Sequence, residues 1–368
     1  MKKASVIIPV YNGEAFLKRC VGEVFSQTYG AIELITIDDG SSDGSLALLR
    51  RLAARSPAHV DMRVFTQRNA GICDTRNRGL DLARGEYIFF MDQDDRIRKN
   101  YIAALVEELE KRENDETGGE NENGRDAGSR EERKDGEDAG SRGGVKDGLK
   151  AGRADMVIGG YSLVDEKGKI LETWKLDSHL PWHRYRITAP WGRVYRREII
   201  EKNHIRFTRT KISEDFYFNV VYMSHCGRIR VTDYVGYAWT FRAASESHTG
   251  MRRQEDDRNP LPMMTQALRD MHRPNPIPPA LLEYLFVKHI VWYLLYTAKG
   301  TSRETLRKSH GECVAWLEEH FPAYTKNPEL CSGGPRGESI KVRAAVRAAV
   351  ALQKAGLFLP LLQVYARS

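Results

Sequence analysis

The chain has 368 residues, 41% of them hydrophobic, and a formal net charge of +7. This length suits one large domain with an appendage, and the hydrophobic content supports a packed core. The five cysteines are odd in number, widely spaced and without a C-x-x-C pattern. This argues against a disulfide framework or a cysteine metal site and predicts free thiols in a reducing compartment.

The sequence also limits where the protein can act and what it can bind. No stretch of 18 residues lacks a charged residue, so a transmembrane helix is not expected. Met1 leads within a few residues into the first predicted strand, which predicts no signal peptide and a cytoplasmic location. The positive charge is compatible with nucleic-acid binding. No recognisable motif accompanies it, and we expect no nucleic-acid partner.

Strands alternate with amphipathic helices over the first 111 residues. We expect strands at Ala4–Val10, Ile32–Ile37, Val60–Thr66 and Glu86–Met91, and helices at Glu14–Tyr29, Ser42–Ala53, Ile72–Ala83 and Asn100–Lys111. Near-continuous apolar strands alternating with such helices predict a mostly parallel sheet with helices on both faces. Ligands then bind beyond the carboxyl ends of the strands.

The composition changes over Asn114–Arg153, which is rich in Gly and charged residues and almost empty of large apolar residues. We predict a disordered, low-complexity insertion over 114–153. A strand is expected at Ala154–Val164, with a return strand to about Trp174. After Arg258 the strand pattern stops. The helices then predicted are Pro279–Lys299, Arg303–His320 and Ile340–Val364.

The apolar stretch Phe89–Met91 is followed by Asp92, Asp94 and Asp95. A strand that ends in several carboxylates favours a hard-cation site, and Mg²⁺ or Mn²⁺ held in this way usually carries substrate phosphates. The alternative is a helix cap with ordinary turn acids. Asp95 fits the alternative better than the other two aspartates do.

Five short motifs occur in a fixed order: V-I-I-P-V-Y-N at 6–12, D-D-G-S-S-D at 38–43, N-x-G at 69–71, R-N-x-G at 76–79 and M-D-x-D-D at 91–95. Together they resemble the nucleotide-sugar domain of family 2 glycosyltransferases. The resemblance implies a GT-A fold, an α/β Rossmann-like domain. It also implies a nucleotide-sugar-binding half at 1–113 and an acceptor or catalytic half at 154–257. The end of the strand pattern after Arg258 predicts a C-terminal helical region at 258–368.

The resemblance implies roles for three acidic residues in the donor half. Asp92 would lie by the ribose and the metal, Asp94 would ligate the Mn²⁺ or Mg²⁺ on the diphosphate, and Asp39 would accept a hydrogen bond from uracil. Asp39 could instead form a turn before the helix that follows it.

Three further residues would complete the donor site. Pro9 and Tyr11 would flank the base, and Arg76 would contact the base or the diphosphate. The alternatives are core packing for Tyr11 and a structural ion pair for Arg76.

The general base should come from the second half. Glu214 and Asp215 follow Ser213 at the start of a predicted helix. The plain interpretation is that Ser213 caps this helix and that the acids suit its positive end. The resemblance instead implies that Asp215 is the catalytic base, with Glu214 contacting the acceptor or supporting the site.

Three other residues of this half are candidates. Trp191 and Arg193 match a W-x-K/R-x-Y-R pattern and would bind the acceptor, although core packing explains Trp191 equally well. His248 would complete the metal site, and an exposed loop histidine is the plainer interpretation.

Residues 340–368 contain five basic residues and no acidic ones, next to the apolar run Leu357–Leu362. This pattern favours contact with an anionic membrane surface. The alternative is a basic helical cap that packs its apolar face on the catalytic domain.

The resemblance implies inverting transfer of a hexosyl or N-acetylhexosaminyl group. The donor would be a UDP-sugar and the acceptor a glycan or lipid-linked glycan, in bacterial surface polysaccharide synthesis on or near the plasma membrane. A nucleotidyltransferase is an alternative, but residues 11–14 lack the Gly- and Lys/Arg-rich phosphate loop that it needs. The other alternative is a non-catalytic nucleotide-sugar or glycan-binding module. The presence of Asp92, Asp94 and Asp215 together argues against it.

Overall fold

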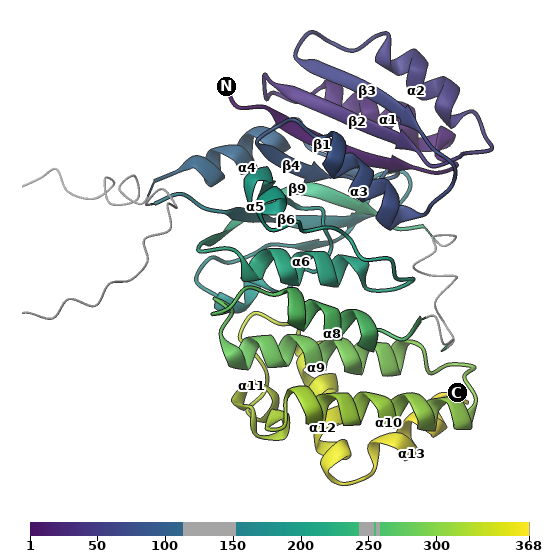
Figure 1. Cartoon of the computed structure of the whole chain (residues 1–368), viewed down its shortest axis with the longest axis vertical. Helices are drawn as coiled ribbons and strands as arrows, with labels where there is room; N and C mark the ends of the chain where they lie inside the picture. Colours follow the sequence, from purple (N-terminus) through teal and green to yellow (C-terminus); the bar gives the residue numbers. More distant parts are fainter. Residues whose placement is uncertain (113–151, 243–253, 255–257, 368) are drawn as a thin grey trace, which may run out of the picture.

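A computed structural model describes residues 1–112, 152–242, 254 and 258–367. The predicted insertion at 114–153 lies almost wholly outside the described residues, as does His248. Figure 1 shows a twisted sheet in the upper part of the molecule, helix α6 below it, and the C-terminal helices stacked beneath α6.

One nine-stranded sheet forms the centre, in the order β3-β2-β1-β4-β8-β6-β9-β5, with β7 paired to β6. The strands are β1 (Ala4–Val10), β2 (Ile32–Asp38), β3 (Val60–Thr66), β4 (Tyr87–Phe90), β5 (Arg96–Ile97), β6 (Met156–Val164), β7 (Ile170–Trp174), β8 (Arg193–Arg196) and β9 (Ile229–Thr240). The strands β3, β2, β1 and β4 are parallel, as the alternating pattern predicts. Strand β8 then enters antiparallel between β4 and β6, so the second half of the sheet is mixed.

Alternating side chains of β1 serve two separate cores. Val6 and Ile8 belong to a cluster with helices α1, α2 and α4 on one face. Ile7 belongs to a cluster with α3, α5 and α6 on the other. Successive strand side chains point to opposite faces, so a wholly apolar strand requires helices on both sides.

The helices of the α/β part are α1 (Glu14–Phe25), α2 (Ser45–Ala53), α3 (Ile72–Leu82), α4 (Tyr101–Glu110), α5 (Arg197–Lys202) and α6 (Glu214–Ser224). Helix α2 begins three residues later than predicted. The segment before it is held as a loop, because the Asn12 side chain accepts a hydrogen bond from the Ser42 backbone and Glu14 accepts one from Gly44.

The C-terminal region is helical, as predicted. It contains α8 (Leu261–Asp270), α9 (Pro279–Tyr296), α10 (Arg303–His320), α11 (Pro328–Cys331), α12 (Ile340–Lys354) and α13 (Phe358–Tyr365), with a short 3₁₀ turn at Tyr324–Lys326. Another 3₁₀ turn, Pro181–Arg184, lies between β7 and β8. Helix α8 was not predicted. Pro260 and Pro262 lie at its start, where proline is tolerated. The single helix expected at 340–364 was wrong, because Gly356 adopts a positive φ of 72° that ends α12.

These helices share a core with the α/β part of the fold. One continuous apolar cluster runs from Ile7 in β1 through Phe216 in α6 to Leu362 in α13. No helix in the described part of the chain is long and apolar enough to cross a membrane. All five cysteines are free, as predicted, and four of them are buried.

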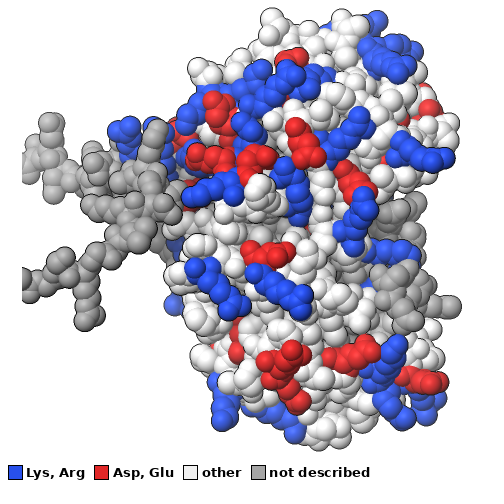
Figure 2. Space-filling view, viewed as in Figure 1, with Lys and Arg blue, Asp and Glu red and all other residues white. Residues whose placement is uncertain are grey.

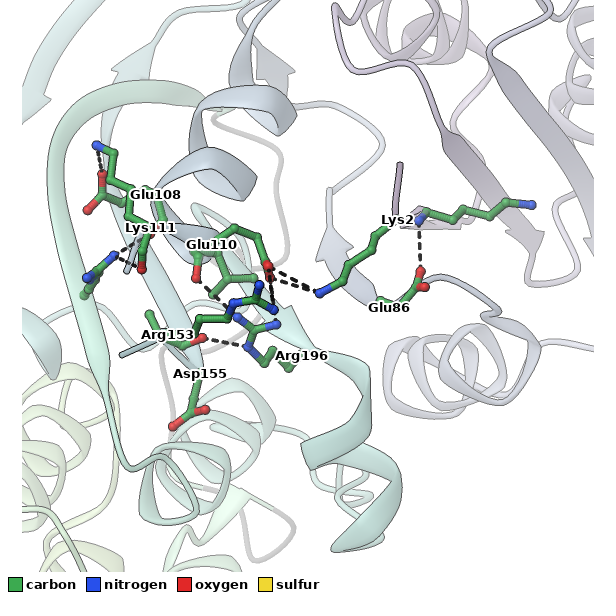
Figure 3. Close-up of polar contacts among 12 residues, drawn as sticks. Lys2, Glu86, Glu108, Glu110, Lys111, Arg153, Asp155 and Arg196 are labelled. Atoms are coloured by element: carbon green, nitrogen blue, oxygen red, sulfur yellow. Dashed lines mark hydrogen bonds and ion pairs between the residues drawn. The ribbon is translucent and has the colours of Figure 1, made fainter. Parts of the chain in front are cut away.

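The chain leaves the described structure after residue 112 and re-enters it at residue 152, and these two ends lie close together. Glu110, at the end of α4, pairs with Arg153 at 3.2 Å and with Arg196 of β8 at 2.9 Å. Figure 3 shows Lys2 reaching the same carboxylate from the N-terminal strand. The two ends of the undescribed segment are therefore fixed close together on one side of the sheet.

We predict that replacing residues 114–150 with a short Gly/Ser linker leaves the fold and donor hydrolysis intact. The ends already meet at the Glu110–Arg153 pair, and loop-closure free energy changes by only about 0.6 kcal/mol per doubling of length. Thermal melting and release of UDP from a UDP-sugar check this. A large fall in melting temperature would contradict it, and lost transfer with retained hydrolysis would assign the segment to acceptor binding.

A second prediction concerns the close packing of α3 on β1. A Cβ on Gly79 would lie 2.3 Å from Cγ2 of Ile7. Gly79→Ala should therefore lower the free energy of unfolding by about 1–3 kcal/mol through overpacking. Gly22 in α1 is the matched control, since nothing lies within 4 Å of its added Cβ. Gly22→Ala should raise the free energy of unfolding by up to about 1 kcal/mol, measured by urea denaturation. Equal effects of the two changes would contradict the packing argument.

Candidate active site

The candidate site lies where the carboxyl ends of β1, β2 and β4 meet the start of α6. Parallel pairing places Val10 beside Asp38, and the next residue, Asp39, donates its backbone N–H to the carbonyl of Val10 at 2.7 Å. The aspartates after β4 emerge at the same edge, as expected for neighbouring parallel strands. Arg76, in the first turns of α3, faces this edge.

Arg76 is the residue that joins the two halves. Its guanidinium lies 2.7 Å from Oδ1 of Asp215 and 3.1 Å from Oδ1 of Asp92, and 3.7 Å from Oε1 of Glu214. It also lies over the ring of Phe207. The Arg76 side chain is 4% exposed, whereas those of Asp92 and Asp215 are each 30% exposed. The buried guanidinium of Arg76 thus brings together two partly exposed carboxylates, one after β4 and one at the start of α6.

The charges at this point shift one another's protonation. Partial burial raises the pKa of Asp215 to about 7, with help from the Glu214 and Asp92 carboxylates and against the effect of Arg76. Burial also raises the pKa of Asp92, although Arg76 opposes the rise. Burial alone would lower the pKa of Arg76, but the three carboxylates outweigh it and raise that pKa. A carboxyl with a pKa near 7 has the basicity that suits a general base near neutral pH.

Asp94, near Asp92, is paired with a second arginine, Arg242. Its carboxylate pairs with Arg242 at 2.9 Å, and the Arg242 guanidinium lies 4.3 Å from the centre of the Phe16 ring. Arg242 lies two residues after the end of β9, and no local sequence pattern connects it to Asp94. No role was predicted for Arg242 from the sequence.

Asp95 is buried and structural, in agreement with the plainer interpretation. Its carboxylate accepts hydrogen bonds from the Tyr237 hydroxyl at 2.6 Å and from the Thr240 backbone at 2.8 Å. These bonds tie the turn after β4 to β9. They fix the backbone from which Asp92 and Asp94 project.

Asp39 and Tyr11 lie at the same edge but in different surroundings. Both carboxylate oxygens of Asp39 accept hydrogen bonds, from Gln67 and from the Ala70 and Gly71 backbones. The Tyr11 ring is 49% exposed, which excludes core packing. Its backbone is fixed by two hydrogen bonds with the Gln93 side chain. Pro9, inside β1, is buried.

The start of α6 differs from the prediction that Ser213 caps it. Ser213 has a positive φ of 70°, and its side chain makes no capping bond. Its hydroxyl lies 2.7 Å from Nε2 of His289, which comes from α9. Burial lowers the pKa of His289 to about 3, so this imidazole is neutral. Because the contact spans 76 residues, local sequence gave no sign of it.

Trp191 and Arg193, the two predicted acceptor residues, face inward. Trp191 stacks on Tyr237 with ring centres 4.7 Å apart. Arg193 is fully buried and donates hydrogen bonds to Asn219 and to the Ile187 carbonyl. Asn219 in turn donates to the carbonyl of Asp215. Arg193 thus supports the start of α6 through Asn219, whereas Trp191 packs against the sheet residue Tyr237.

The metal prediction rests on two residues. No group of three or more His, Cys, Asp or Glu side chains suited to a metal occurs among the described residues, and the third predicted ligand, His248, is not described. Asp92 and Asp94 nevertheless carry hard oxygen donors, are partly exposed and leave the same strand end. This donor set fits Mn²⁺ or Mg²⁺.

Comparison with known proteins finds glycosyltransferases. The family model for glycosyl transferase family 2 matches residues 5–203, more than half of the chain. Glycosyltransferase GlyA of Streptococcus pneumoniae is 36% identical over 109 residues, 29% of this chain and 15% of that protein. The uncharacterized glycosyltransferase YibD of Escherichia coli is 39% identical over 104 residues, 28% of this chain and 29% of that protein. The matched segments make up 15% to 36% of the first four curated relatives.

Two solved structures have a similar fold. S. aureus TarS 1–349, in complex with UDP-GlcNAc, has a TM-score of 0.61 at 17% identity, covering 99% of this chain and 90% of that one. The mannosyltransferase PcManGT from Pyrobaculum calidifontis, in complex with GDP-Man and Mn²⁺, has a TM-score of 0.50 at 14% identity, covering 99% and 86%. The predicted GT-A fold is confirmed by this likeness.

Proposed function

The chain belongs to glycosyl transferase family 2, and on that premise we propose that it is an inverting glycosyltransferase. The donor is a UDP-sugar, and the acceptor is a hydroxyl of a glycan or lipid-linked glycan. The observation that carries the proposal is the Arg76 bridge, which sets a carboxylate of the donor half and one of the acceptor half on either side of a single guanidinium.

In this mechanism Asp215 is the general base. It removes the proton from the acceptor hydroxyl, whose oxygen attacks the anomeric carbon while the bond to UDP breaks. The proton ends on Asp215, and the electron pair ends on the diphosphate. The pKa of about 7 at Asp215 supports this role. Glu214, 3.7 Å from the same guanidinium, supports the site or contacts the acceptor.

The donor residues take the roles that the family pattern implies. Tyr11 stacks on the base beside Pro9, Asp39 accepts from the base, and Asp92 lies by the ribose. The exposed Tyr11 ring and its fixed backbone support stacking. Asp39 needs only a spare lone pair, because a carboxylate offers about four acceptor positions and it uses three.

The leaving diphosphate needs positive charge. Asp92 and Asp94 would hold Mn²⁺ or Mg²⁺, which stabilises the departing oxygen. Arg242, already paired with Asp94, is suited to contact phosphate oxygens. The solved structures of this fold with UDP-GlcNAc and with GDP-Man and Mn²⁺ support a nucleotide-sugar donor.

For acceptor binding we amend the expected roles of Trp191 and Arg193. We propose that Arg193 positions the start of α6 through Asn219, and that Trp191 positions the turn after β4 through Tyr237, which bonds Asp95. The donor half at 1–113, the catalytic half at 154–257 and the helical region at 258–368 remain our proposed division. We also propose that the transferred group is a hexosyl or N-acetylhexosaminyl group and that the reaction belongs to bacterial surface polysaccharide synthesis. It would take place in the cytoplasm next to the plasma membrane.

Asp215→Asn should lower kcat by about 10²–10⁴-fold, the usual cost of removing a general base. Binding of the UDP-sugar should persist, since the donor residues are untouched. Glu214→Gln, one residue earlier in the same turn, is the matched control and should lose much less. Release of UDP gives kcat, and calorimetry gives donor binding. Near-normal kcat in Asp215→Asn with a large loss in Glu214→Gln would reverse the two roles.

The metal proposal predicts that EDTA abolishes transfer and that Mn²⁺ or Mg²⁺ restores it. Asp94→Ala should be nearly inactive at every concentration of metal, because a principal oxygen ligand is gone. Release of UDP is again the readout. Full activity in the presence of chelator would refute the proposal.

A further inference from the structure

Helix α13 has two apolar faces. Phe358 and Leu362 are buried against the neighbouring helices, at 5% and 0% exposed. On the other side, Leu357, Leu361 and Val364 are 53%, 45% and 68% exposed. They recur at spacings of four and three residues, so they form one stripe along the helix. Scattered exposed apolar residues are common on soluble proteins, but a continuous outward stripe opposite a buried one needs a partner.

Basic residues frame this stripe. Lys354 lies just before it and Arg367 just after it, and both are exposed. The ammonium of Lys299 lies 5.2 Å from the ring centre of Tyr365, itself 38% exposed. No acidic residue occurs in 340–368. Figure 2 shows mainly uncharged surface at the lowest edge of the molecule, near α12 and α13, with Lys and Arg at its sides and Asp and Glu side chains just above it.

We propose that this outer face of α13 docks on an anionic lipid surface. The helix lies in the plane of the interface, with Leu357, Leu361 and Val364 among the acyl chains. Lys354 and Arg367 reach the headgroups along their apolar stems. No helix in the described residues could span the bilayer, so the contact is peripheral and sensitive to salt.

A second copy of the chain is the main competing occupant of this face. A symmetric contact would bring Lys354, Arg367 and Lys299 of one copy close to the same residues of the other. Like charges placed together across an interface suppress association. An anionic surface instead matches both the apolar stripe and its basic frame. The contact also leaves the catalytic residues free, since none of them lies on α13.

The test uses the full chain and two kinds of vesicle, pure phosphatidylcholine and phosphatidylcholine with phosphatidylglycerol. We expect at least a tenfold stronger partition onto the anionic vesicles in a sedimentation assay, lost at high salt. Leu361→Glu combined with Val364→Glu should weaken this partition at least tenfold. Val364→Glu alone, at the most exposed of the stripe positions, should give part of that loss and covers the case of a double variant that folds poorly.

The matched control is Ile170→Glu with Leu171→Glu in β7. These residues are 55% and 51% exposed, so the same charge is added at equally exposed apolar positions away from α13. The control should bind vesicles within twofold of the unaltered chain. Equal loss in the control would reduce the effect to net charge and overturn the proposal, as would equal binding to neutral vesicles.

Two further readouts separate this inference from the proposed glycosyl transfer. UDP release from a UDP-sugar in solution should be unchanged in the α13 variants, because α13 is remote from Arg76 and Asp215. Size-exclusion chromatography tests the competing occupant. A larger species that disappears in the α13 variants would assign the face to contact between copies and overturn the membrane proposal.

Discussion

The geometry of the candidate active site depends on one buried ionic contact. Arg76 is almost fully buried and faces carboxylates from segments far apart in the chain, Asp92 after β4 and Glu214 and Asp215 at the start of α6. An unpaired guanidinium at this depth would be costly, and carboxylates this close would repel one another without it. The guanidinium and the carboxylates therefore need each other, and the turn after β4 and the start of α6 are held in one relative position.

Hydrogen bonds from several parts of the fold position the residues around this contact. Asp95 ties the turn after β4 to β9 through Tyr237 and Thr240, and Asn219 ties α6 to the buried Arg193. From the C-terminal helices, His289 reaches Ser213, the residue before Glu214. Lys288, its neighbour, pairs with buried Glu338, which also accepts a hydrogen bond from Trp182. The helical region thus supports the catalytic half as well as covering its core.

Sequence patterns located the strands and the donor motifs well, because both are local. The strands β1 and β3 have the predicted bounds, because β1 is a largely apolar run and β3 alternates apolar with polar residues, and both patterns are typical of strands. The start of α2 and the break at Gly356 were missed, because loop hydrogen bonds and a single backbone angle decide them. Trp191 and Arg193 have side chains suited to sugars, but burial in the tertiary structure gave them other contacts. The pairs Arg76–Asp215, Arg242–Asp94 and His289–Ser213 join distant segments, and a single sequence carries no signal for them.

The central claim is that Arg76 sets the charge state of Asp215 in a glycosyl-transfer site. The pH dependence of kcat/KM for UDP release tests it most directly, because this ratio reports the ionisation of the free enzyme. The unaltered chain should lose activity below an inflection near pH 7, where Asp215 titrates. In Arg76→Gln the inflection should move to higher pH, since the cation that lowers the Asp215 pKa is gone. An identical inflection in both proteins, with the fold of the variant confirmed by circular dichroism, would contradict the account.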